Sequence, residues 1–207
     1  MNTDDKKQIT DYFRSNIFEA LSLYTAWKML SHSKSTGVVS EQMAHRYVEV
    51  QNYHSNFFGA AERAFLVSFV MLVLHPFDSR DDSFSLYKVD KAATEEFVTS
   101  NESVMDALRA LRNKLFAHRD SSTSPSKNFT IPSAVNMDKF FEDLINLYNK
   151  FTSIVDRSTT TFQNATEVKR DIELLFMNLY RGEAMRKKEI DIEWTWEKDN
   201  KKASDVL

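Results

Sequence analysis

The chain of 207 residues carries a formal net charge of −3, which excludes binding of nucleic acid over its whole surface and allows only a local basic patch. It contains no cysteine, and therefore no disulfide, no thiolate zinc site and no cysteine nucleophile. Its 3 glycines and 3 prolines are too few for the turns of β-hairpins and phosphate loops, so we expect an all-α fold.

The N-terminal part of the chain predicts two helices. Apolar residues spaced three and four positions apart indicate a long amphipathic helix from about Asp4 to Ser33. Ser40 has the side chain of an N-cap, and we expect the helix that starts after it to run as far as His75. Pro76 stops that helix, because proline cannot continue the hydrogen-bond ladder. The first residues are polar and include no apolar core of a signal peptide, so we expect a cytoplasmic protein.

The most apolar run covers residues 64–74 and is too short for a membrane span, which takes about 20 residues. Glu62 and Arg63, just before it, make a longer span costly. We therefore expect no contact with a membrane and a core helix that is apolar on all sides. Aromatic residues recur at helical spacing in this region, and we assign them to the core rather than to base stacking: Phe57, Phe58, Phe65 and Phe69.

Further helices are predicted in the second half of the chain. Ser83 is expected to cap a short helix, and Asn101 to cap a longer one with apolar residues at core spacing. Helices also follow from the apolar pattern at 136–156 and at about 165–188, with a serine-rich loop before the first of them.

The C-terminal segment has a different period. Residues 190–196 alternate between apolar and polar side chains, as a strand does, and residues 128–131 are the partner that we expect for it. The chain would then consist of a helical bundle domain over residues 1–188 and a C-terminal strand or tail, residues 189–207, packed on the bundle.

The stretch 112–120 combines residue types that suit phosphodiester chemistry: Arg112, Asn113 and His118. A histidine can donate or accept a proton near neutral pH, and the planar guanidinium of an arginine donates several hydrogen bonds to phosphate oxygens. Three further cations close in sequence would form a basic surface along the RNA backbone: Arg109, Lys114 and Arg119. Arg109 can equally pair with Asp106 and be structural.

The spacing of the motif bears on how many chains form the site. In an unbroken helix the step from Arg112 to His118 leaves the side chains about 120° apart in rotation and about 9 Å apart along the axis. One helix therefore does not aim both at one atom. Either the helix ends near Ala117, or two copies of the chain meet and surround one phosphate, which favours a homodimer with a composite site.

The reaction that best uses these residues is RNA transesterification, which needs no metal. His118 would act as general base on the 2′-hydroxyl or as general acid on the leaving 5′-oxygen. Arg112 would neutralise charge on the phosphoryl oxygens, while Asn113 would bond the phosphate or orient His118. His45 and His54 lie about 13 Å apart along their predicted helix, too far to share a metal, and we assign no metal and no cofactor.

Residues 111–118 resemble the signature of the HEPN superfamily (higher eukaryotes and prokaryotes nucleotide-binding), an arginine, a polar residue and, a few positions later, a histidine. Five residues lie between Arg112 and His118, and Asn113 is the polar follower. Residues 75–86 are similar to the abortive-infection branch of the superfamily, and the likeness runs from about Phe57 to Asp120.

The resemblance implies an antiparallel helical bundle, usually a homodimer, and metal-independent endoribonuclease activity on single-stranded RNA. Such proteins often serve as toxins or antiphage effectors, so an antitoxin protein is a candidate partner. On this resemblance Arg112 and His118 are the catalytic pair, and Asn113 supports them. In the branch of the family that is paired with nucleotidyltransferase antitoxins, the residue at the position of Asp120 is a tyrosine that becomes modified. This chain has an aspartate there, which argues against control by tyrosine modification and against a nucleotidyltransferase partner.

Two other functions remain open from the sequence. The first is a non-catalytic dimeric module that binds a nucleotide or nucleic acid with Arg112, Arg119 and nearby lysines. The second is a structural interaction protein in which the motif serves as a dimer seam. In that case Arg112 and His118 should be buried and paired inside the protein.

Overall fold

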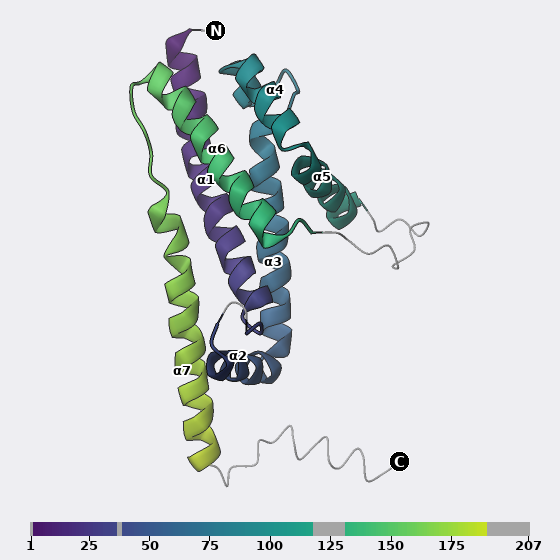
Figure 1. Cartoon of the computed structure of the whole chain (residues 1–207), viewed down its shortest axis with the longest axis vertical. Helices are drawn as coiled ribbons and strands as arrows, with labels where there is room; N and C mark the ends of the chain where they lie inside the picture. The colour runs from purple at the N-terminus through teal and green to yellow at the C-terminus, as the bar shows by residue number, and fades with distance from the viewer. Residues whose placement is uncertain (1, 37–38, 118–130, 190–207) are drawn as a thin grey trace.

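The computed structural model describes residues 2–36, 39–117 and 131–189. Within these ranges the chain forms seven α-helices and no strand, which confirms the prediction of an all-α helical bundle (Figure 1). The α-helices are α1 (Thr3–His32), α2 (Glu41–Tyr53), α3 (Ser55–Leu74), α4 (Lys91–Ser100), α5 (Glu102–Ala117), α6 (Ala134–Val155) and α7 (Val168–Glu189). Three short 3-10 helices connect them: η1 (His75–Phe77), η2 (Leu86–Lys88) and η3 (Gln163–Thr166).

The main core lies where α1 packs against α3 and α6 (Figure 1). Tyr24 of α1 is at its centre: its ring stacks on Phe141 of α6 at 5.0 Å and meets Phe69 of α3 edge-on at 5.6 Å. The Tyr24 hydroxyl donates to Asp138 at 2.8 Å, so its polar end is satisfied while the ring is buried. Each such aromatic side chain contributes about 1.5 to 3 kcal/mol through burial, and together they hold the three helices side by side.

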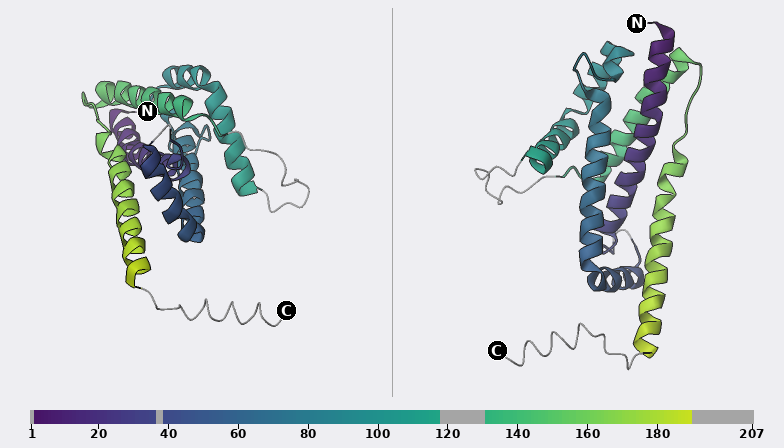
Figure 2. Two further views of the ribbon diagram at one scale, coloured as in Figure 1. Left: turned by 60° about the horizontal axis from the view of Figure 1, so that its bottom comes forward. Right: turned by 180° about the vertical axis from the view of Figure 1, so that it is seen from behind.

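A second core joins α2 and α7 to the lower end of the bundle in Figure 1. Phe176 of α7 is fully buried between Tyr47 of α2, at 4.5 Å, and Phe58 of α3, at 5.3 Å. The views in Figure 2 show α7 and α5 on opposite sides of the α1–α3 pair.

The prediction of one helix from residue 40 to His75 is wrong, although Ser40 caps its start as expected. The helix breaks at His54, which has φ −110° and ψ 37°, and α2 lies across the end of α3 (Figure 1). Contacts with a distant part of the chain fix this turn. The Gln51 amide of α2 donates to the Leu30 carbonyl at 3.0 Å and to the Ser33 hydroxyl at 2.9 Å, both at the end of α1.

The expectation that the apolar helix would be a core helix on all sides is also wrong. One face of α3 is buried, but another face exposes a row of apolar residues. We call this row the α3 stripe: Phe57, Ala60, Ala64 and Met71. Phe57 is 61% exposed and Met71 44% exposed. The residues recur at three-, four- and seven-residue intervals, so they lie along one side of the helix.

The apolar segment is also longer than the expected run of residues 64–74, since Glu62 and Arg63 lie inside the helix rather than ending it. By length and composition alone, Ser55–Phe77 would suffice to cross a membrane. In the structure this helix packs on α1, α2 and α5 as part of the helical bundle.

The connections after α3 are partly as predicted. Pro76 ends the helix, but Ser85, not Ser83, caps the short helix that follows, since its hydroxyl accepts from the Tyr87 N–H at 3.3 Å. The sequence patterns did not predict α4, which Asp90 caps. Asn101 lies between α4 and α5, as predicted for the start of α5, and its amide donates to the last turn of α4.

The last two helices agree with the predicted ranges within a few residues. Residues 190–196 and 128–130 lie outside the described residues, so the C-terminal strand and the boundary of the tail at residue 189 stay predictions.

Candidate functional site

Helix α5 carries the site because its two faces differ. Buried residues at helical spacing fasten one face to the main core: Val104, Met105, Leu108 and Leu111. Arg109 and Arg112, one turn apart, fall on the edge of that face and reach the surface beside α3. The core contacts of α5 therefore fix the direction in which both guanidinium groups extend.

The end of α3 forms the opposite side of the site. Pro76 stops the helix, and the chain turns so that Asp78 and Arg80 come next to each other. The Asp78 carboxylate accepts from Nη2 of Arg80 at 2.7 Å, from its Nε at 2.9 Å and from its backbone N–H at 3.1 Å. These bonds hold the pKa of Asp78 below its usual range, because the charged form is the one that accepts them.

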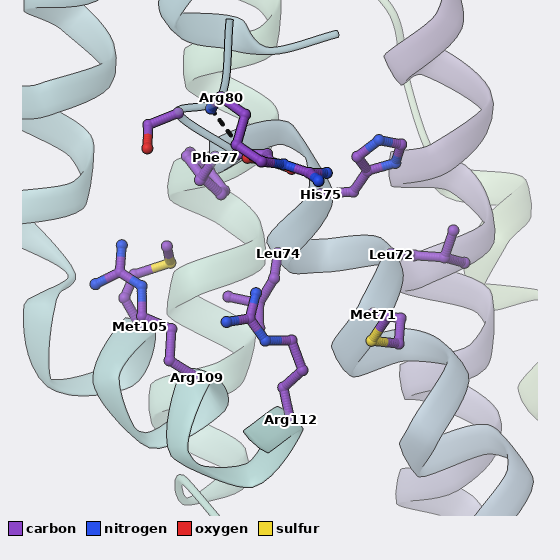
Figure 3. Close-up of a pocket in the computed structure, with 11 residues that line it drawn as sticks. Met71, Leu72, Leu74, His75, Phe77, Arg80, Met105, Arg109 and Arg112 are labelled. Atoms are coloured by element: carbon purple, nitrogen blue, oxygen red, sulfur yellow. Dashed lines mark hydrogen bonds and ion pairs between the residues drawn. The ribbon is translucent and has the colours of Figure 1, made fainter. Parts of the chain in front are cut away.

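A cavity of about 680 Å³ lies between these two sides (Figure 3). Its cationic lining groups are Arg80, Arg109 and Arg112. Asp78 is the one carboxylate among the residues that line it, and it is already engaged by Arg80. Leu74 and Met71 supply apolar surface beside the arginines (Figure 3). The cavity is thus a cationic recess with an apolar floor, suited to an anionic ligand with a ring or ribose.

The three arginines differ in what holds them. Arg109 pairs with Asp106 at 3.1 Å, which confirms the structural pairing considered from the sequence. Arg112 is half-buried and donates from Nε and Nη2 to the Asn113 side-chain oxygen at 3.3 and 3.2 Å. No carboxylate of the described residues pairs with Arg112, so its charge is available to a ligand.

His75 lies at the rim of this cavity, but its ring points toward α1 (Figure 3). Its Nδ1 lies 3.1 Å from the Asn16 amide nitrogen and 3.5 Å from the Tyr12 hydroxyl, and the ring packs edge-on against Phe13. These contacts fasten the end of α3 to α1.

The other predicted site residues can be placed only in part. Asn113 is exposed at the surface of α5 beside Arg112. Lys114 belongs to α5, but the structure describes only its backbone, and His118 and Arg119 lie outside the described residues. The relation of Arg112 to His118 therefore stays a prediction.

Sequence reasoning missed Arg80. The stretch that contains it was singled out only for its resemblance to the abortive-infection branch. The signal that would have found it is Pro76, which ends α3 and turns the chain back toward α5. Among the described residues no group of three or more histidine, aspartate or glutamate side chains could hold a metal ion.

Fold and site together define an all-α bundle with a cationic cavity beside one of its core helices. Residues 86–176 match the family model HEPN_AbiU2, described as AbiU2. This match supports a HEPN-superfamily, abortive-infection-like family, as the resemblance of the motif implied. The match begins later in the chain than the resemblance did, and it extends into α7. No curated protein and no solved structure gave a match to the chain.

Proposed function

We propose that the chain is a metal-independent endoribonuclease that cleaves single-stranded RNA in the cytoplasm, as a toxin or an antiphage effector of abortive infection. The observation that carries the proposal is the state of Arg112. It lies in an open cationic cavity, pairs with no described carboxylate, and precedes His118 by the HEPN spacing inside the matched region. The guanidinium of an arginine without an acidic partner can bind a phosphate, whereas a paired arginine stabilises the fold.

The proposed reaction is transesterification within the RNA chain. His118 removes the proton of a 2′-hydroxyl, whose oxygen attacks the adjacent phosphorus. The bond from phosphorus to the 5′-oxygen breaks, and that oxygen takes a proton from an imidazolium, supplied by His118 of the same or the second copy. Arg112 stabilises the charge on the phosphoryl oxygens, and Asn113, bonded to Arg112, holds the guanidinium in place. The products are a 2′,3′-cyclic phosphate and a free 5′-hydroxyl.

The structural alternative, in which the motif is only a dimer seam, required Arg112 to be buried and paired within the protein. Arg112 is instead half-buried at an open cavity without an acidic partner among the described residues. A non-catalytic module that binds nucleic acid uses the same cavity, and the chemistry of the product distinguishes it from the nuclease.

We expect the purified protein to cut a pool of single-stranded RNA in the presence of EDTA and to leave 2′,3′-cyclic phosphate ends. The reason is that proton transfer and arginine replace the metal in this reaction. Cleavage is followed by gel electrophoresis, and the ends are identified by their resistance to a phosphatase that removes only open monophosphates. A His118→Ala preparation, purified in parallel, controls for contaminating ribonuclease.

Two outcomes would contradict the proposal. Cleavage that is lost in EDTA and regained with a divalent cation would remove the metal-independent mechanism. Salt-sensitive RNA binding without any cleavage would leave the non-catalytic module in its place.

We further propose that the chain acts as a homodimer joined through the α3 stripe, and that an antitoxin protein restrains it. The stripe exposes apolar side chains along the side of α3, and contiguous apolar surface of this kind marks contact sites. Met71 belongs both to the stripe and to the lining of the cavity. A twofold axis parallel to α3 would therefore place the two cavities side by side, as a composite site requires.

Ala64→Glu should convert the dimer to a monomer, since it puts a charge from each copy into the centre of the stripe. We expect the mass in solution to halve by light scattering and RNA cleavage to fall at least tenfold. Glu96, exposed on α4, offers a matched control, because Glu96→Ala changes one charge away from the stripe and should alter neither quantity. A wild-type protein that is monomeric at every concentration would refute the dimer.

A further inference from the structure

The cavity has a cationic arm on each side, and the two arms come from parts of the chain that are distant in sequence. Arg112 and Arg109 reach it from α5, while Arg80 reaches it from the turn after η1 (Figure 3). Arg80 precedes the region matched by the HEPN family, which begins at residue 86. The matched motif therefore accounts for one side of the cavity only.

Arg80 is an exposed but oriented cation. Its side chain is 73% exposed, yet Asp78 accepts hydrogen bonds from both its Nε and its Nη2. A carboxylate in this position fixes the plane of the guanidinium while its Nη1 keeps no acceptor among the described residues. Asp78 itself is only 25% exposed. Asp78 thus orients the exposed guanidinium of Arg80 before a ligand binds.

The opposite arm has a different character. Arg112 carries an uncompensated charge within the described part of the site, and Arg109 stands one turn before it, paired with Asp106. Leu74 and Phe77 lie between the two arms, and neither carries a charge. A ligand that satisfies this arrangement has two anionic groups separated by a less polar unit.

We propose that Arg80 forms a second phosphate subsite, which binds the RNA phosphate next to the one held by Arg112, with one ribose and base over the apolar floor between them. This inference rests on the proposed ribonuclease function and deepens it, because it makes a single-stranded RNA segment, rather than an isolated phosphate, the ligand of the cavity. A volume of about 680 Å³ is within the range of pockets that enclose a nucleotide-sized ligand.

The subsite is tested by binding of a fluorescent, fully 2′-O-methylated single-stranded RNA, which cannot be cleaved because its 2′-oxygens carry no proton. Arg80→Ala should lower affinity about fivefold at 0.1 M salt and reduce the slope of log K against log salt by about 0.7, the loss of one phosphate contact on a single strand. Arg80→Lys should keep the slope, since it keeps the charge. Arg170→Ala, which removes an exposed arginine from α7 on the other side of the bundle, should change neither value.

The outcomes separate this inference from the proposed function. If Arg80→Ala and Arg170→Ala weaken binding equally, or Arg80→Ala has no effect while wild-type protein binds and cleaves RNA, the subsite is wrong and the nuclease stands. If the wild-type protein binds no RNA, both are wrong. In cleavage assays Arg80→Ala should raise KM and leave kcat within about twofold, which agrees with a group that positions RNA outside the reacting bond.

Discussion

Arg112→Ala should lower kcat for RNA cleavage by about 10²- to 10³-fold, which is the usual cost of removing a group that stabilises charge in a transition state. The side chain lies in an open cavity and pairs with no described carboxylate, so its loss should leave the fold intact. Rates are measured with saturating RNA, and thermal unfolding by circular dichroism verifies the fold. His118→Ala should have an effect of similar size, about 10²- to 10⁴-fold.

Arg109→Ala is the matched control for this experiment. It removes the same side chain one turn earlier on α5, from a residue already paired with Asp106, and should change KM more than kcat. The double variant Arg112→Ala, His118→Ala should be about as slow as the slower single variant, because residues that act in one step are not additive. Equal kcat for wild type and Arg112→Ala would remove Arg112 from the mechanism.

The sequence predicted those parts of the fold that depend on local pattern. Helices α1, α6 and α7 were predicted to within about three residues because their apolar residues keep one period over six or more turns. The break between α2 and α3 could not be found in this way, since both sides of His54 have a helical pattern. Its cause is a set of long-range contacts, Gln51 with the end of α1 and Tyr47 with Phe176.

The site shows the same division. Arg109 and Arg112 were predicted because they belong to one continuous motif on one helix. Arg80 was not, because only the turn at Pro76 and the packing of α3 on α5 bring it to the same cavity. The hydrogen bonds that its partner Asp78 accepts from Arg80 give Asp78 a positioning role, which the sequence pattern alone does not indicate.

The face that α3 buries can be tested with two adjacent residues of the same type. Phe58 is 5% exposed and stacks on Phe176 at 5.3 Å, whereas Phe57 is 61% exposed. Phe58→Ala should lower the free energy of unfolding by about 3 kcal/mol, since it empties space in the second core, and Phe57→Ala should lower it by less than about 0.5 kcal/mol in the monomer. Urea unfolding followed by far-ultraviolet circular dichroism measures both values.

The dependence of stability on protein concentration distinguishes a core residue, Phe58, from an interface residue, Phe57. A residue in the core stabilises each copy, so the shift caused by Phe58→Ala should be the same at every concentration. A residue in the α3 stripe stabilises only the dimer, so any additional shift caused by Phe57→Ala should disappear on dilution below the dissociation constant. If Phe57→Ala costs as much as Phe58→Ala at all concentrations, α3 buries a different face, and the proposed dimer surface is lost with it.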